Sequence, residues 1–361
     1  MSAALVTGGA GFMGSHVAEH LLQLGHEVVV LDDLSGGFAD NVPERAAFIK
    51  GSILDEKLID RLFAKYRFAY VYHLAAYAAE GLSHFIKRFN YRNNLIGSVN
   101  LINAVVNYDV QCFVFTSSIA VYGAGQSPMT EEMTPVPEDS YGIAKLAVEQ
   151  ELHVSHEMFG LDYVIFRPHN VYGERQNIGD RYRNVVGIFM NQLLRGEPMT
   201  IFGDGTQMRA FTHINDIAPV IAACVGYPSA RNQIFNVGAD VPYTVNDLAE
   251  VVAEAMGKEC RTVHLDPRKE VKIAFSDHGK AEAVFGAREK TSLKLGVCAM
   301  ADWVENHGAR ESSVFEEIEV SKNLPPSWAK VARGQRVTRK EEARGLNRGN
   351  PSGPRETRSF S

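Results

Sequence analysis

Short apolar runs alternate with longer amphipathic segments along most of the chain. The runs are rich in Val, Ile, Phe and Tyr, and the segments between them carry apolar residues at helical spacing. This alternation is typical of a parallel β-sheet covered by helices. We predict strands at residues 3–7, 28–31, 47–50, 69–74, 112–117, 163–167 and 234–237, and helices at 15–24, 56–66, 85–108, 141–159 and 245–256. These seven strands predict an α/β protein with one doubly wound parallel sheet.

The pattern changes after residue 167, where a looser stretch rich in Arg, Asn and Gly runs from 170 to 183. We therefore predict a first domain at 1–170, with returning segments at about 211–238. A smaller C-terminal lobe is predicted at 171–330. The remaining residues, 331–361, are rich in Gly, Pro, Ser and Arg and nearly free of large apolar residues, which is the composition of disorder.

Charge is unevenly distributed along the chain. Residues 331–361 hold eight Lys or Arg and three Glu, a charge of +5, so residues 1–330 carry −11 of the total of −6. An acidic body argues against nucleic acid as a main partner. For the basic tail, a solvated extension is favoured over an arm that binds nucleic acid or another partner.

Composition also bears on location. No run reaches the roughly 18 apolar residues of a membrane span, and the N-terminus lacks the pattern of an export signal. The four cysteines, Cys112, Cys224, Cys260 and Cys298, are far apart and show no metal-binding spacing. We expect unpaired thiols, no metal site, no membrane contact and a cytoplasmic location.

A glycine-rich turn follows the first predicted strand. Gly8, Gly11 and Gly14 stand between residues 3–7 and a helical pattern, and Asp32 follows 18 positions after Gly14. Spaced glycines allow a tight turn and a close approach to a pyrophosphate, while a carboxylate roughly 20 residues on can bind a ribose. An ordinary Gly-rich turn is the alternative, but the β-α-β context favours a Rossmann-type site for a dinucleotide.

A second candidate site combines a phenol, an amine and hydroxyl groups. Tyr141 and Lys145 are four residues apart on a predicted helix, so their side chains share one face. An ammonium near a phenol favours the phenolate. The hydroxyls of Thr116, Ser117 and Ser118 end a predicted strand, where open parallel sheets present ligand-binding groups. Together these groups could take a proton from a substrate hydroxyl.

These features resemble the short-chain dehydrogenase/reductase superfamily, and more narrowly its extended branch of nucleotide-sugar epimerases and dehydratases. The resemblance covers roughly residues 3–305. It rests on the glycine loop, Asp32, His73-Leu74-Ala75-Ala76, Asn94, Ser117-Ser118-Ile119-Ala120-Val121-Tyr122-Gly123, Tyr141-x-x-x-Lys145, Arg167-Pro168-His169-Asn170-Val171-Tyr172-Gly173, Ile201-Phe202-Gly203-Asp204-Gly205 and Arg209-Ala210-Phe211-Thr212-His213.

The resemblance implies a role for each matched position. It assigns catalysis to Ser118, Tyr141 and Lys145, and implies NAD as cofactor, because no basic residue follows Asp32 closely. The implied cofactor-binding residues are Gly8, Gly11, Phe12, Met13, Gly14, Asp32, Ser52, Ile53, Leu74, Ala75, Ala76, Asn94, Thr116, Tyr141 and Lys145. The implied substrate-binding residues are Ser118, Asn170, Arg183, Arg209, Arg268, Glu270 and Ala274.

The reaction within the branch depends on a few positions. The dehydratases carry an Asp-Glu pair after the catalytic hydroxyl, whereas this chain has Ile119 and Ala120, which cannot move a proton. We therefore expect an isomerase, an NAD-dependent UDP-sugar 4-epimerase that inverts C4 of a UDP-hexose such as UDP-glucose or UDP-galactose. The resemblance also implies a homodimer through the helices predicted at 85–108 and 141–159.

The chain departs from the family pattern at three positions. Ser52 stands where the family has an Asp that contacts adenine, Ala78 where epimerases often have Lys, and Ala274 where some relatives have a Tyr that bars bulky sugars. A small residue at 274 would admit an acetamido group, and an Arg near residue 183 could read a C6 carboxylate. UDP-N-acetylhexosamine and UDP-glucuronate therefore remain alternative substrates.

Two other functions stay open at this stage. A UDP-glucuronate decarboxylase would share the oxidation step, and a non-catalytic NAD-binding sensor would need only the glycine loop. The complete set of Ser118, Tyr141 and Lys145 favours an enzyme over a sensor.

Overall fold

The computed structural model describes residues 2–124, 127–268, 271–310, 318–326 and 328. The chain divides into two units, Met1–Val314 and Phe315–Ser361. All helices and strands below lie in the first unit. In the second unit, Lys322 and Asn323 form a turn, with Leu324 N–H donating to the Ser321 carbonyl. The tail predicted at 331–361 lies outside the described residues.

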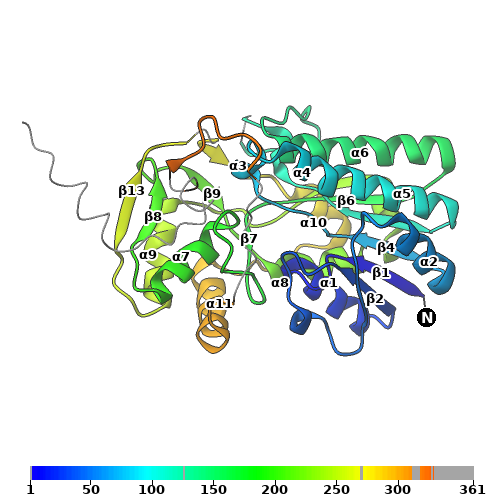
Figure 1. Ribbon diagram of the computed structural model, residues 1–361, viewed down its shortest axis with the longest axis horizontal. Coiled ribbons are helices and arrows are strands. Elements are labelled where there is room, and N and C mark those ends of the chain that lie inside the picture. The colour runs from blue at the N-terminus through cyan, green and yellow to red at the C-terminus, as the bar shows by residue number, and fades with distance from the viewer. Residues whose placement is uncertain (1, 125–126, 269–270, 311–317, 327, 329–361) are drawn as a thin grey trace, which may run out of the picture. The chain divides into compact units, whose positions relative to one another are not determined.

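Helices and strands alternate along the first unit (Figure 1). The strands are β1 (Ala3–Thr7), β2 (Glu27–Asp32), β3 (Ala47–Lys50), β4 (Tyr70–His73), β5 (Cys112–Thr116), β6 (Tyr163–Pro168), β7 (Val171–Tyr172), β8 (Met199–Phe202), β9 (Met208–Ala210), β10 (Thr212–His213), β11 (Gln233–Val237), β12 (Pro242–Thr244), β13 (Thr262–Leu265) and β14 (Ile273–Ala274). The α-helices are α1 (Phe12–Gln23), α2 (Glu56–Tyr66), α3 (Glu80–Ser83), α4 (Lys87–Tyr91), α5 (Gly97–Asn107), α6 (Ser140–Phe159), α7 (Val185–Leu194), α8 (Ile214–Ala223), α9 (Val245–Ala255), α10 (Gly279–Phe285) and α11 (Leu293–His307).

Seven of these strands form one parallel sheet in the order β11-β6-β5-β4-β1-β2-β3. They are the seven strands expected from the apolar runs, which confirms the doubly wound α/β class. The strand order reverses between β1 and β4, where Leu5 pairs with Val29 on one side and with Val71 on the other. Ligands of open parallel sheets bind at such a switch point, beyond the carboxyl ends of the strands.

Side chains alternate between the two faces of this sheet, because successive residues of a strand point to opposite sides. Along β1, Ala4 and Val6 pack with α1, α8 and α10, while Leu5 packs with α2, α5 and α6. Figure 1 shows α5 and α6 on one side of the sheet and α1 and α8 on the other. Each fully buried aliphatic or aromatic side chain contributes roughly 1.5–3 kcal/mol of hydrophobic stabilisation, so these two layers hold the sheet in place.

A second hydrophobic core lies beyond β7. It is formed by α7, α9 and α11 with β8, and includes Phe189, Leu248 and Val297. Two small sheets border it: β13 pairs with β8, and β9 lies between β12 and β14. Between these elements, α8 and β11 return to the large sheet.

The helix expected at 85–108 is interrupted. Residues Arg92–Ile96 form a π-helical turn between α4 and α5. This turn directs the side chain of Asn94 inward, where its Oδ1 accepts a hydrogen bond from Tyr77 N–H at 2.8 Å and its Nδ2 donates to Asn90 at 2.8 Å. Such single π turns occur frequently at functional sites, and this one supports a loop that borders the large pocket.

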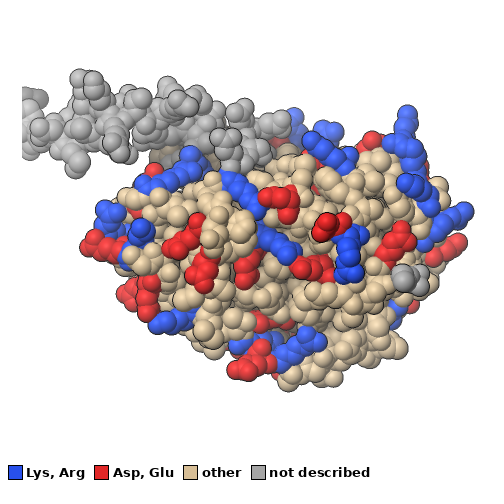
Figure 2. Space-filling view, turned by 90° about the horizontal axis from the view of Figure 1, so that it is seen from below, with Lys and Arg blue, Asp and Glu red and all other residues tan. Residues whose placement is uncertain are grey.

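The last two features of the fold are the lengths of its apolar helices and the distribution of charge on its surface. Within the described part of the chain, helix length and apolar content fall short of what crossing a membrane requires. On the face shown in Figure 2, Lys and Arg are interspersed with Asp and Glu.

Candidate active site

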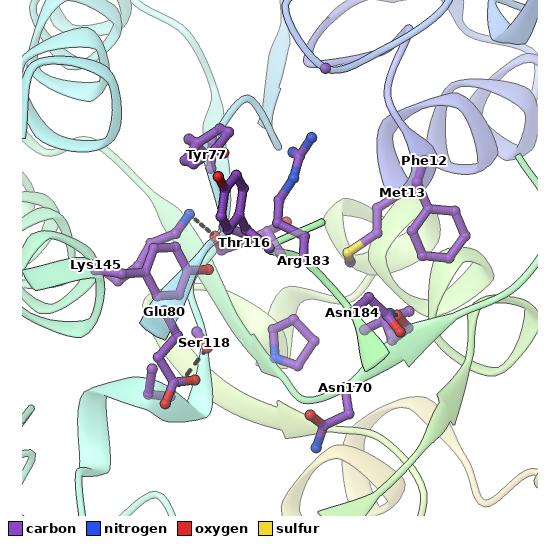
Figure 3. A pocket seen from close by; sticks show the side chains of 18 of the residues that line it. Phe12, Met13, Tyr77, Glu80, Thr116, Ser118, Lys145, Asn170, Arg183 and Asn184 are labelled. Atoms are coloured by element: carbon purple, nitrogen blue, oxygen red, sulfur yellow. Dashed lines mark hydrogen bonds between the residues drawn. The ribbon is translucent and has the colours of Figure 1, made fainter. Parts of the chain in front are cut away.

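A cavity of about 550 Å³ opens at the carboxyl ends of the central strands. It runs from the glycine turn after β1, past the end of β5, to β9 and β14. In Figure 3, Phe12 and Met13 lie on one side of this cavity, and Lys145, Glu80 and Ser118 lie on the other. The position agrees with the switch point of the sheet, so we consider this cavity the candidate active site.

The glycine turn leaves no room for side chains. A Cβ on Gly8 would lie 2.7 Å from the backbone nitrogen of Ala75, and one on Gly14 would overlap the Gly8 carbonyl oxygen. Gly8 also has a φ of 72°, which glycine adopts without strain. The bare backbone and the N-terminus of α1 therefore form a cradle suited to the pyrophosphate of a dinucleotide.

Asp32 at the end of β2 is fixed beside this cradle. One carboxylate oxygen accepts a hydrogen bond from Ala10 N–H at 3.0 Å, and the other accepts one from Leu34 N–H at 2.8 Å. Burial raises the pKa of this carboxyl group, and the two backbone hydrogen bonds lower it. Asp32 and its exposed neighbour Asp33 both line the pocket. This pair suits the free ribose hydroxyls of NAD and opposes the extra phosphate of NADP.

Lys145 belongs to α6, and its side chain reaches the end of β5. Its Nζ donates a hydrogen bond to the Thr116 carbonyl at 2.7 Å (Figure 3). Burial lowers the pKa of Lys145 to about 7, and the charge of Glu149 opposes this effect. The hydroxyl of Thr116 is buried and has no hydrogen-bond partner among the described residues. An unpaired buried hydroxyl on the pocket wall fits a polar ligand at this position.

Tyr141 is buried on the same helix face as Lys145. The Lys145 Nζ lies 5.8 Å from the centroid of the Tyr141 ring. Burial raises the pKa of the phenol above its ordinary value, the negative charges of Asp139 and Glu80 add to this rise, and a hydrogen bond with Ser118 opposes it. In the protein alone the pKa of Tyr141 is therefore raised, and the expectation that Lys145 favours a phenolate stays a prediction.

A buried ionic cluster supports the catalytic strand and helix from behind. Glu149 on α6 accepts hydrogen bonds from Arg167 at 2.9 and 2.5 Å and from the Ser117 hydroxyl at 2.5 Å. Arg167 on β6 also donates to the Tyr122 hydroxyl at 2.7 Å. Both charged side chains are almost fully buried. The cluster joins α6, β5 and β6, and so fixes Lys145 relative to Ser118.

The far end of the pocket is rich in arginine and amide groups. Arg209 on β9 donates hydrogen bonds to the carbonyls of Val271 and Met208. The Arg268 guanidinium lies 4.6 Å from the centroid of the Phe202 ring, and Asn170 Nδ2 donates to the Ala210 carbonyl at 3.1 Å. These groups, with Ala274, line one end of the cavity. Their charge and fork geometry suit a diphosphate and its nucleoside.

Arg183 extends toward the middle of the cavity (Figure 3). Its guanidinium pairs with Asp180 at 2.7 Å and lies 4.9 Å from the centroid of the Tyr77 ring. The nearby Arg175 pairs instead with Glu19 at 2.6 Å. Of these two arginines, Arg183 lines the pocket and Arg175 does not. The charge of Arg183 is partly neutralised by Asp180.

The structure brings most of the predicted site residues to one pocket. The pocket is lined by Gly8, Gly11, Phe12, Met13, Gly14, Asp32, Ser52, Ile53, Leu74, Ala75, Ala76, Thr116, Ser118, Tyr141, Lys145, Asn170, Arg183, Arg209, Arg268 and Ala274. Asn94 lies behind the wall, where it holds the backbone of Tyr77. Glu270 lies outside the described residues. Sequence reasoning missed Tyr77 and Glu80, although both follow the His73 motif closely.

Comparison with known proteins then places the chain in a family. Residues 4–238 match the NAD dependent epimerase/dehydratase family. This match spans well over half of the chain, so the protein belongs to that family. The geometry of the loop from Gly8 to Gly14 and of Asp32 fits the NAD-binding role that the sequence predicts for them.

Individual relatives narrow the comparison. A UDP-glucose 4-epimerase of Mycolicibacterium smegmatis is 33% identical over 310 residues, which cover 84% of this chain and 98% of the relative. The crystal structure of UDP-glucose 4-epimerase with UDP-glucose from Thermotoga maritima has a TM-score of 0.81 and 35% identity, covering 84% of this chain and 99% of that one. A UDP-glucuronic acid 4-epimerase from Bacillus cereus, solved with UDP-glucuronic acid and NAD, has a TM-score of 0.78 and 28% identity over 84% of this chain and 99% of that one.

These findings bear on several expectations. They confirm the resemblance drawn from the motifs, the Rossmann-type fold, the assignment as an enzyme of this family and NAD as its cofactor. The relatives act on different sugars, so the identity of the sugar is a separate question.

Proposed function

We propose that this protein is an NAD-dependent UDP-sugar 4-epimerase and that its substrate is a neutral UDP-hexose. The observation that carries the proposal is the convergence of Ser118, Tyr141 and Lys145 at one end of a cavity whose other end holds Arg209 and Arg268. One end can handle a sugar hydroxyl, and the other can bind a nucleoside diphosphate. The family membership and the relatives support the same reaction.

The protein's own groups handle the proton of this reaction. Bound NAD would supply a hydride acceptor that later returns the hydride, together with a positive charge that favours the phenolate. Ser118 would hold the C4 oxygen of the sugar by a hydrogen bond, while Tyr141 takes the proton from the C4 hydroxyl. When the hydride returns to the opposite face of C4, Tyr141 gives the proton back. The sugar is thus isomerised with no net gain or loss of electrons.

The pocket offers little support for loss of water. Ile119 and Ala120 occupy the positions after Ser118, and both line the pocket without an ionisable group. A dehydratase needs an acid and a base there. Inversion at C4 uses Tyr141 for proton transfer and needs no acid or base at positions 119 and 120, so epimerisation is favoured over dehydration.

The charge near the catalytic hydroxyl favours a neutral sugar. Glu80 is an exposed pocket residue next to Ser118 (Figure 3), and its negative charge reaches Tyr141. A C6 carboxylate on the substrate would add a further negative charge to this end. Arg183 could balance it only in competition with Asp180. We therefore propose UDP-glucose and UDP-galactose ahead of UDP-glucuronate as substrates.

Two alternative functions within the same family use the same catalytic groups. Ala274 is a small residue on the pocket wall, which leaves room for the acetamido group of a UDP-N-acetylhexosamine. A UDP-glucuronate decarboxylase would share the oxidation at C4 and then lose carbon dioxide. A non-catalytic sensor gains no support from a pocket that contains all three catalytic groups.

One experiment separates these functions. The protein is incubated in heavy water with UDP-glucose, UDP-galactose, UDP-glucuronate and the two N-acetyl sugars, and the sugar protons are followed by NMR. We expect UDP-glucose and UDP-galactose to interconvert without deuterium at C4. A pentose product would indicate the decarboxylase, no change would indicate a sensor, and deuterium at C5 would contradict the 4-epimerase.

A further inference from the structure

A buried cluster of two histidines lies next to the substrate end of the pocket. His169 follows β6, Ser276 follows β14, His278 precedes α10 and Asp240 follows β11. His169, Ser276 and His278 are each about 2% exposed, whereas the Asp240 side chain is 57% exposed. Three segments that are distant in sequence therefore meet at one polar cluster, and the proposed reaction uses none of its groups.

The four side chains are joined by short contacts. His169 Nδ1 lies 3.0 Å from the Ala210 carbonyl oxygen, and His169 Nε2 lies 3.1 Å from His278 Nε2. His278 Nε2 is also 3.1 Å from the Ser276 hydroxyl, and His278 Nδ1 is 2.5 Å from Asp240 Oδ1. The two imidazole planes differ by 20° and their centroids are 5.3 Å apart, so the nitrogens meet edge to edge.

The contacts in this cluster are all satisfied only if it holds one proton more than its neutral histidines supply. A carbonyl oxygen only accepts, so the contact with Ala210 needs a hydrogen on His169 Nδ1. A neutral His169 then has a bare Nε2, and the contact between the rings needs a hydrogen on His278 Nε2. The Asp240 carboxylate requires another hydrogen on His278 Nδ1. All of these contacts are satisfied when His278 carries both hydrogens, as an imidazolium. A neutral His278 would instead accept from the Ser276 hydroxyl and would leave the contact between the two Nε2 atoms without a hydrogen.

The extra proton has no better position in the cluster. His169 is buried without a carboxylate of its own, and burial lowers its pKa to about 3. Asp240 is largely exposed to solvent, and its Oδ1 lies 2.5 Å from His278 Nδ1. The charge therefore belongs on His278, paired with Asp240.

The cluster fixes two parts of the pocket wall. His169 is followed directly by Asn170, which lines the pocket, and Ala274 pairs with Arg209 between β14 and β9. Met129 holds the segment around Ser276 from the other side, through backbone hydrogen bonds with Phe275 and Asp277. The contact between His169 and His278 therefore ties the end of β6 to the segment that follows β14.

We propose that His278 is a positioning residue whose protonated form fastens the wall that carries Asn170, Arg209 and Ala274, so that protonation of His278 strengthens binding of the substrate nucleotide. The proposal rests on the proposed function for the identity of the nucleotide. The proton count itself is independent of that function.

The direction of the pH effect follows from the groups around His278. Burial lowers its pKa, Asp240 opposes this by raising it, Lys290 lowers it further and Asp277 raises it slightly. His169 faces it as a neutral ring. Since the net shift is downward, His278 loses its proton at a lower pH than a free imidazole does, and its protonated form gains weight toward acidic pH. Binding of a nucleotide should accordingly be tighter at pH 5.5 than at pH 8.

The first measurement detects the proton directly. Protein labelled with ¹⁵N-histidine is examined by two-dimensional NMR of the ring nitrogens between pH 5 and pH 8, and His278 is assigned with the His278→Gln variant. We expect both nitrogens of His278 to be protonated at pH 5.5 while His169 remains neutral. A neutral His278 throughout this range would overturn the proposal.

The second measurement tests the consequence with UDP as the probe, by calorimetry at pH 5.5 and pH 8. We expect wild-type protein to bind UDP at least about threefold more tightly at the lower pH. The His278→Gln variant keeps an N–H donor but cannot titrate. Its affinity for UDP should therefore change less between pH 5.5 and pH 8 than that of the wild type. Titration of UDP itself is common to all variants. An unchanged pH dependence in His278→Gln would contradict the proposal.

Two further variants cover the case in which His278→Gln fails to fold. Asp240→Asn removes the counter-charge at an exposed position, so the pH transition should move to lower pH. Asp277→Asn removes an exposed carboxylate that also caps Gly279, and it should move the pH transition less than Asp240→Asn does, because Asp240 contacts His278 directly. If wild-type protein binds no UDP, the proposed function fails, while the His278 spectrum still decides the proton count.

Discussion

At the scale of single residues, the chemistry centres on Tyr141. Its phenol is buried and close to the charges of Asp139 and Glu80, so its pKa is raised in the protein alone. The Lys145 ammonium lies 5.8 Å from the centroid of the Tyr141 ring and donates one hydrogen bond to the Thr116 carbonyl, which leaves two of its N–H groups available to a ligand.

Replacing this phenol is the most direct test of its role. We expect Tyr141→Phe to lower the rate of epimerisation by at least about a hundredfold, the scale of a lost general base. Bound NAD should remain, since the ring still fills its buried position. Turnover is measured by coupled assay, and NAD by its absorbance after denaturation. An unchanged rate would remove Tyr141 from the mechanism.

At the scale of elements, the turn between β1 and α1 depends on missing side chains. A Cβ on Gly14 would overlap the carbonyl oxygen of Gly8, which belongs to the backbone and cannot move aside cheaply. We expect Gly14→Ala to abolish NAD retention or to reduce the yield of folded protein. Gly226→Ala is the control, since a Cβ there meets nothing within 4 Å. Normal NAD content in Gly14→Ala would argue against the cradle.

The contact between α6 and β6 depends on the buried pair of Glu149 and Arg167. Replacing Glu149 by Gln leaves the Arg167 guanidinium buried without a counter-charge, so we expect a loss of about 3–5 kcal/mol in the free energy of unfolding. Urea denaturation measures this loss. Glu254→Gln removes a partner from the exposed pair with Lys294 and should change stability little. Equal effects of the two variants would contradict this account.

At the scale of the whole molecule, α6 offers a surface for self-association. Ile143, Val154 and Met158 are 44%, 48% and 69% exposed, and their spacing places them along one face of the helix. These exposed apolar side chains make α6 the surface on which the homodimer implied by the family resemblance can be tested. In Figure 1, α5 lies beside α6 on the same side of the sheet.

The prediction is that wild-type protein sediments as a dimer and that Met158→Glu shifts it toward monomer. A charge in an apolar interface must be desolvated, which opposes association. Leu295→Glu is the matched control, because Leu295 is also 69% exposed but lies on α11. Wild-type protein that sediments as a monomer, or two variants that behave alike, would rule out this interface.

Several features of the fold follow from local sequence. The apolar runs marked all seven strands of the main sheet, because a strand buried on both faces needs apolar side chains at every position. The spacing of Tyr141 and Lys145 placed both on one face of α6. By contrast, the π-helical turn at Arg92–Ile96 was missed, because its cause is a set of hydrogen bonds from Asn90 and Asn94 to distant segments.

The sequence by itself determined the sheet, the glycine turn and the set of candidate catalytic groups, because these depend on spacing along short stretches of chain. Tertiary structure alone decided which charges surround those groups. Glu80 and Asp139 act on Tyr141, and His278 meets Asp240 and His169, only because the folded chain brings distant segments within a few ångströms. Electrostatic interactions depend on distance and burial in three dimensions, and spacing along the chain does not specify them.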